Sequence, residues 1–193
     1  MQKAILLLSD GRTFSGTSFG SKGNALGEVC FNTGMTGYQE ILTDPSYCKQ
    51  IVTMTAPHIG NYGISSFDIE SKKIHVAGFI VKEDCAYPSN WRSESSISNY
   101  LKDNGVVGVK DIDTRALTRH IRDHGSMNGI ISTDIKDLKL LKTKLDSFPS
   151  MNGLDLAKQV TTKKKYKWQK TKNAIYRVAA IDFGVKYNIL RLL

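Results

Sequence analysis

The feature that most constrains the fold is a continuous apolar run near the C-terminus, residues 177–184, which ends in Asp182-Phe183-Gly184. A run of this length followed by a turn signal is typical of a strand buried on both faces in a parallel sheet. Residues 185–193 follow as the start of a helix. Because one strand and one helix cannot bury their apolar faces alone, we expect them to open an α/β domain whose remainder is missing from this chain.

Upstream, short apolar runs alternate with turn signals, which predicts several strands and helices. Residues 4–8 and 13–18 flank a turn at Asp10-Gly11, so we expect a β-hairpin. A helix over 114–124 has Asp113 as its cap and Gly125 as its stop. Other strands are expected at 26–32, 50–55, 74–81, 106–109 and 127–132, and another helix at 93–104. In an amphipathic helix at 134–148, the residues expected to face the core are Ile135, Leu138, Leu141 and Leu145.

The length and composition fit a globular protein. The chain has 193 residues, which suits one domain or one domain plus a fragment of another, and 40% hydrophobic residues allow a buried core. No apolar run approaches the roughly 18 residues of a membrane span, and the apolar part of the N-terminus is too short for a signal peptide. We therefore expect a soluble, cytoplasmic protein with no membrane contact.

The positive charge is unevenly spread. The formal net charge is +9, and much of it lies between residues 161 and 172, where Tyr166 and Trp168 stand among six lysines, Lys163, Lys164, Lys165, Lys167, Lys170 and Lys172. Basic residues interleaved with aromatic ones can mark nucleic-acid binding. Blocks of like charge are more often exposed linkers, so we expect a solvated basic linker and no nucleic-acid partner.

The three cysteines, Cys30, Cys48 and Cys85, are odd in number and widely spaced. This argues against a disulfide framework and against a structural zinc site. Cys48, near a loop, is the better candidate for a nucleophile, but no activating group is visible around it. His120 and His124 have the i, i+4 spacing of a metal site without a nearby acidic ligand, so we expect them to complement the helix dipole and expect no metal.

One loop contains more small polar residues than a simple connection needs. Residues 31–47 leave a strand, bend at Gly34 and Gly37, form a short helical turn and stop at Pro45. The residue before a proline is biased away from helix, so Ser46 should lie on a loop. Taken alone, this segment predicts an ordinary surface turn.

The same segment carries a family resemblance. Residues 27–47, which include Met35-Thr36-Gly37-Tyr38-Gln39-Glu40-Ile41-Leu42-Thr43-Asp44-Pro45-Ser46-Tyr47, closely resemble the signature of the small, glutamine-hydrolysing subunit of carbamoyl-phosphate synthase. Further motifs of that family stand in the same order at residues 57–61, 111–119, 152–158 and 181–191. The resemblance therefore spans almost the whole chain.

The resemblance implies a fold and a domain organisation. It implies an α/β protein in which residues 1–160 form a swivelling β/β/α layered N-terminal domain. Residues 161–175 would be the basic linker, and residues 176–193 the first strand and helix of a truncated class I glutamine amidotransferase domain. The family's small subunit forms a heterodimer with a large synthetase subunit and passes it ammonia taken from L-glutamine. The large subunit makes carbamoyl phosphate from bicarbonate and ATP, for pyrimidine and arginine synthesis.

The resemblance also assigns the residues of the site. Ser46 is the position that would contact glutamine bound in the amidotransferase domain, and its hydroxyl can both donate and accept hydrogen bonds. None of the three cysteines matches the family nucleophile, so we expect no catalytic residue in this chain and no activity from it alone. The chain should need no cofactor, since ATP and Mg²⁺ would act on the large subunit. The alternative is a free-standing module that binds a protein partner without catalysis.

Overall fold

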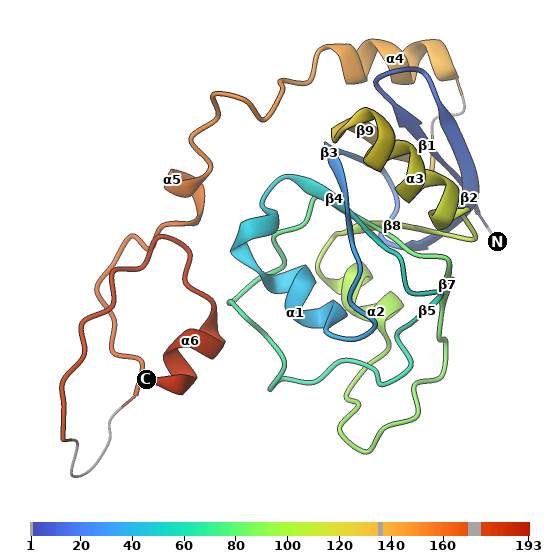
Figure 1. The fold of residues 1–193 in the computed structure, drawn as a ribbon. Coiled ribbons are helices and arrows are strands. Elements are labelled where there is room, and N and C mark those ends of the chain that lie inside the picture. The colour runs from blue at the N-terminus through green and yellow to red at the C-terminus, as the bar shows by residue number, and fades with distance from the viewer. Residues whose placement is uncertain (1, 135–136, 170–174) are drawn as a thin grey trace.

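The expected N-terminal hairpin is present and begins a barrel (Figure 1). The computed structural model describes residues 2–134, 137–169 and 175–193. Strand β1 (Lys3–Leu8) pairs antiparallel with β2 (Thr13–Gly20). The turn between them contains Gly11 with φ of 92°, a left-handed conformation that favours glycine. The Asp-Gly signal in the sequence therefore predicted this turn correctly.

Seven strands close into a barrel in the order β1-β2-β8-β6-β4-β3-β9. The remaining barrel strands are β3 (Asn24–Asn32), β4 (Gln50–Met54), β6 (Gly78–Ile80), β8 (Val107–Lys110) and β9 (Met127–Ser132). Strand β4 runs parallel to both β3 and β6, whereas β9 runs antiparallel to both β1 and β3. Two short strands, β5 (His58–Ile59) and β7 (Glu83–Asp84), pair separately. The structure thus confirms the mixed α/β class, while the swivelling layered arrangement stays a prediction.

The barrel is filled by alternate residues of its strands. One buried apolar cluster draws on all seven strands, and neighbouring residues in a strand point to different clusters. In β4, for example, Ile51 belongs to this inner cluster and Val52 to an outer one. Helix α3 (Thr114–His124) adds Leu117 and Ile121 to the inner cluster.

Three further helices cover the outside of the barrel. Helices α1 (Tyr38–Thr43) and α2 (Ile97–Asp103) share the outer cluster that contains Val52, and α4 (Leu138–Asp146) packs Leu141 and Leu145 on β1 and β9. The expectation that Leu138 faces the core is wrong: it is the first residue of α4, beside the capping Asp137, and is exposed. Ile135 lies outside the described residues. No helix in the described part of the chain is long and apolar enough to cross a membrane.

The C-terminal part differs most from the expectation. The buried strand expected over 177–184 is absent, because no other strand of the described residues lies alongside to share a hydrogen-bond ladder. Ile181 is 80% exposed and Phe183 66% exposed. The helix expected after it does form, as α6 (Tyr187–Leu192). In Figure 1 this red segment and the short α5 (Ala157–Val160) lie to the left of the barrel, on the side of α1.

Candidate functional site

Ser46 is held at the surface by a loop that is otherwise buried. Helix α1 ends at Thr43, and a 3-10 turn, η1 (Pro45–Tyr47), follows directly. Asp44 caps this turn: its Oδ1 accepts a hydrogen bond from the Ser46 amide at 2.9 Å. Asp44 and Pro45 are buried, whereas Ser46 is exposed. Within the described part of the chain the Ser46 hydroxyl makes no hydrogen bond, so it is free to bind a ligand.

The start of α1 is fixed by a tyrosine that directly follows the family motif at residues 57–61. Gly37 has φ of 81° and is the residue before the helix, which confirms the expected bend there. The Tyr62 hydroxyl accepts hydrogen bonds from the amides of Gly37 (2.6 Å) and Tyr38 (3.3 Å). The rings of Tyr38 and Tyr62 stack at 4.3 Å, and the Tyr38 hydroxyl donates to the Gly63 carbonyl at 2.7 Å. Burial raises the pKa of both tyrosines, so both act as neutral groups.

A buried glutamine fixes the middle of the same helix. Gln39 is 1% exposed, and its amide makes two reciprocal bonds of 2.8 Å with the backbone of Ser65, donating to the carbonyl and accepting from the amide. A buried amide with both ends satisfied fixes its surroundings in one arrangement. The conspicuous residues Tyr38 and Gln39 therefore support the site and do not line it.

Ser46 lines a pocket whose other wall comes from a distant part of the chain. The pocket has a volume of about 210 Å³ and is lined by Pro45, Ser46, Cys48, Leu156, Ala157, Val160, Phe183 and Gly184. Gly184 has φ of 104°, and a Cβ placed on it would lie 2.7 Å from Val160 Cγ2 and 3.2 Å from the Pro45 Cβ. Only glycine allows the segments to approach so closely.

An ion pair fastens the second wall to the Ser46 loop. Lys186 Nζ lies 2.7 Å from Asp44 Oδ2, while Oδ1 of the same carboxylate accepts the bond from Ser46. The hydrogen bond to Asp44 raises the pKa of Lys186 above its ordinary value. One carboxylate thus links Lys186 to the backbone of Ser46.

The cysteines offer little nucleophilic chemistry. Cys30 lies in β3, where burial, and next the nearby Glu28, raise the pKa of its thiol to about 12. Cys48 lines the pocket beside Ser46, but the residues that line that pocket include no histidine, lysine or arginine to stabilise a thiolate. Cys85 donates a hydrogen bond to the Tyr87 carbonyl at 3.2 Å.

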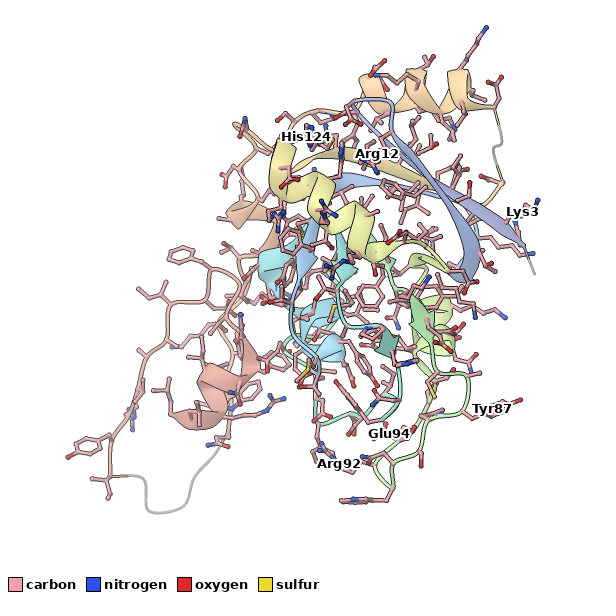
Figure 2. The ribbon with its side chains drawn as sticks, turned by 45° about the vertical axis from the view of Figure 1, so that its right-hand side comes forward. Lys3, Arg12, Tyr87, Arg92, Glu94 and His124 are labelled. Carbon is pink, nitrogen blue, oxygen red and sulfur yellow. The ribbon has the colours of Figure 1, made fainter. Side chains whose placement is uncertain are left out.

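A second hollow lies against α3. It has a volume of about 280 Å³ and is lined by Arg12, Ala116, Arg119, His120, Asp123 and His124 (Figure 2, where Arg12 and His124 are labelled). Arg12 donates to His120 Nδ1 at 3.0 Å, so His120 Nε2 donates to Asp10 at 2.5 Å. The rings of His120 and His124 stack at 4.4 Å. Both nitrogens of His120 are thus already engaged by protein groups.

The lysine-rich segment is exposed, but its two aromatic residues contact other parts of the chain. Lys163, Lys164, Lys165 and Lys167 are exposed, and Lys170 and Lys172 lie outside the described residues. The Tyr166 hydroxyl donates to Asp182 at 2.8 Å, and the Trp168 ring packs on Tyr187 at 4.7 Å. These aromatic residues hold the segment against the second wall of the pocket.

The sequence indicates Ser46 as a candidate but does not indicate the residues that hold its loop in place. Asp44 carries a signal that could have been read, since an aspartate before a proline is typical of a capped turn. Tyr62 and Val160 lie outside the family motifs given above. Lys186 lies in one of them (residues 181–191), but nothing local indicates its role, which depends on Asp44 far away in the chain.

Comparison with known proteins gives the family. The family model for the carbamoyl-phosphate synthase small chain, CPSase domain, matches residues 6–131. The carbamoyl phosphate synthase small chain of Syntrophotalea carbinolica is 56% identical over 201 residues, covering 98% of this chain and 54% of that protein. The protein of the same name from Buchnera aphidicola subsp. Schizaphis graminum is 49% identical over 207 residues, covering 100% and 54%.

Almost all of the barrel from β1 to β9 and the loop that carries Ser46 lie within the matched residues, so this part of the chain has the CPSase domain of a small chain. This chain is a member of the carbamoyl-phosphate synthase small chain family. The chain spans about half the length of the curated relatives it matches.

Proposed function

We propose that this chain is the N-terminal part of the small subunit of a glutamine-dependent carbamoyl phosphate synthase. In this proposal the complete small subunit releases ammonia from L-glutamine and delivers it to a large subunit. The large subunit then forms carbamoyl phosphate from bicarbonate and ATP, with Mg²⁺, for pyrimidine and arginine synthesis. Membership of the family supports this assignment.

The observation that carries the proposal is the position of Ser46. It is the exposed residue of a buried loop, its hydroxyl has no partner among the described residues, and a pocket at its side is closed by residues 183–184. A free hydroxyl in such a place can donate to a carboxylate and accept from an ammonium group, and an amino acid such as glutamine carries both. Ser46 would therefore bind and orient glutamine without taking part in bond cleavage.

The chemical step would be carried by groups outside these 193 residues. A thiol nucleophile needs a nearby base and donors for the developing oxyanion. Cys30 is held neutral by burial, and the pocket around Cys48 has no basic lining residue. We infer that none of the three cysteines is the glutaminase nucleophile.

The test is assembly followed by a comparison of nitrogen sources. A full-length small chain containing this sequence should co-purify with a large chain and make carbamoyl phosphate from either glutamine or ammonia. Absence of a complex, or a complex that uses ammonia but gains nothing from glutamine, would contradict the proposal.

Exposed aromatic residues favour a second candidate, a protein-binding module without catalysis. Trp91 is 93% exposed and Tyr87 90% exposed, on the loop that precedes α2. Aromatic residues in such positions are frequent anchors of protein interfaces. Size-exclusion chromatography separates the two candidates, because a clean monomer favours the module and aggregation favours an enzyme fragment.

A further inference from the structure

Glu70 joins the barrel side of the structure to helix α6. The residue is 7% exposed, and its Oε2 accepts a hydrogen bond from the Asn188 amide at 2.9 Å. The Glu70 carbonyl accepts from the Tyr187 amide, also at 2.9 Å. Two free amides at the start of α6 are therefore satisfied by one residue that lies 118 positions from Asn188 in the chain.

Arg191, in the last turn of α6, strengthens the same contact. Its guanidinium lies 3.5 Å from Glu70 Oε1 and donates to the carbonyls of Phe67 (3.1 Å) and Ile69 (2.8 Å). The positive charge of Arg191 stabilises the Glu70 carboxylate, because that side chain is only 10% exposed and a buried carboxylate needs a cation or hydrogen bonds. Both ends of α6 are thus attached to residues 67–70.

The same residue is tied to the loop that carries Ser46. The Glu70 amide donates to Thr43 Oγ1 at 2.9 Å, and the Ser71 hydroxyl donates to the Thr43 carbonyl at 2.6 Å. Thr43 is the last residue of α1 and directly precedes Asp44, the cap of the turn that holds Ser46. Residues 70–71 therefore bind the Ser46 loop on one side and α6 on the other.

We propose that Glu70 is a positioning residue for glutamine use, which holds α6 and the segment before it in register with Ser46. This inference rests on the proposed function and extends it to a residue that does not touch the pocket. Glu70 lies outside the pocket lining, so its effect on glutamine must pass through α6 and Thr43. Loss of its carboxylate would let the two walls move apart and weaken the contact between Ser46 and glutamine.

The test uses a full-length small chain assembled with its large chain. Glu70→Ala should raise the KM for glutamine roughly tenfold, with ammonia-dependent synthesis unchanged. Glu70→Gln keeps an acceptor for the Asn188 amide but loses the charge that faces Arg191. Its KM for glutamine should therefore lie between those of the wild type and Glu70→Ala. Asp68→Asn is the matched control: Asp68 lies on the same loop as Glu70, but its carboxylate pairs with Arg92 and not with α6, so the KM for glutamine should stay unchanged.

The outcomes separate the inference from a general folding role and from failure of the proposed function. An equal loss of glutamine- and ammonia-dependent activity in Glu70→Ala would indicate a general folding role and overturn the inference. An unchanged KM for glutamine would also overturn it. Hydrogen exchange of the Tyr187 and Asn188 amides, measured in the same samples, needs no glutamine: faster exchange in Glu70→Ala supports the contact, and unchanged exchange contradicts it. A wild-type complex that cannot use glutamine would instead refute the proposed function.

Discussion

Asp44 and Lys186 form an ion pair of 2.7 Å between two segments far apart in the sequence, and Asp44 also holds the Ser46 amide at 2.9 Å. The Asp44 side chain is 8% exposed and that of Lys186 46%. The aspartate is thus a fixed part of the loop, while the lysine reaches it from the surface. Ser46 is consequently held by the segment that contains Lys186 as well as by its own turn.

Replacement of Ser46 by alanine tests the site directly. In a full-length small chain, Ser46→Ala should lower kcat/KM for glutamine by roughly tenfold, since one hydrogen bond to substrate is lost. Ammonia-dependent synthesis should stay nearly unchanged, because ammonia needs no glutamine site. Steady-state assays with both nitrogen sources give the answer, and an equal loss of both activities would indicate a folding defect.

Tyr62→Phe removes only the hydroxyl that caps α1. The amides of Gly37 and Tyr38 would lose their acceptor, so the free energy of unfolding should fall by about 1–3 kcal/mol. Tyr100→Phe is the matched control, because the Tyr100 hydroxyl makes no hydrogen bond within the described part of the chain. Urea denaturation measures both variants, and equal changes would argue against the cap.

Gly184→Ala probes the close approach at the pocket. The new Cβ would lie 2.7 Å from Val160 Cγ2, and the backbone would keep a φ of 104°. Gly153→Ala is matched in backbone, with φ of 80°, but meets nothing within 4 Å. Gly184→Ala should therefore increase hydrogen exchange at residues 182–190, and Gly153→Ala should not. Equal exchange in the two variants would mean that the approach to Val160 is not needed.

The segment around Asp182 should detach in acid. Burial raises the pKa of Asp182, but hydrogen bonds from the Val185 and Gly184 amides and from Tyr166 outweigh it, so the pKa lies below its ordinary value of 3.8. A carboxylate with a lowered pKa stabilises the structure above its unfolded pKa and loses that effect as the pH falls through the folded pKa. The contact should thus be complete above the ordinary pKa of 3.8 and be lost progressively as the pH falls further, through the lower pKa that Asp182 has in the folded protein.

Trp168 reports this detachment because its ring packs on Tyr187. The chain has two tryptophans, so in a Trp91→Phe background all tryptophan emission comes from Trp168. The emission should change below pH 3.8, the ordinary pKa, before far-UV circular dichroism shows loss of the barrel. Asp182→Asn lacks the titrating carboxylate, so its Trp168 emission should show no transition between neutral and acidic pH. A transition that persists unaltered in that variant would show that another group is responsible.

The sequence was informative where local rules decide the structure. Strand β9 (Met127–Ser132) and helix α3 (Thr114–His124) have the expected bounds, because β-branched residues and clear caps define them. Closure of the barrel could not be predicted from the sequence, because β9 pairs with β1 and β3, which are distant from it in the chain. The run at 177–184 was misread because an apolar segment becomes a strand only when neighbouring strands are present.

The residues of the candidate site also differ in whether a local sequence pattern indicates them. Ser46 followed from a motif and a nearby proline, which are both local. Glu70 and Lys186 matter only because α6 returns to the Ser46 loop, and no pattern around either residue announces this. Residues that join two distant segments are those for which a single sequence carries the least information.

The place of β9 in the barrel has a consequence for how the chain acquires its structure. β9 fills the gap between β1 and β3, yet it is the last barrel strand to leave the ribosome. Until residues 127–132 emerge, β1 and β3 each present an unpaired edge that can associate with other chains. Long-range strand pairing of this kind is slow, so the nascent chain should depend on chaperones during this interval. The emergence of Ser132 from the ribosome is the step that ends this exposure to aggregation.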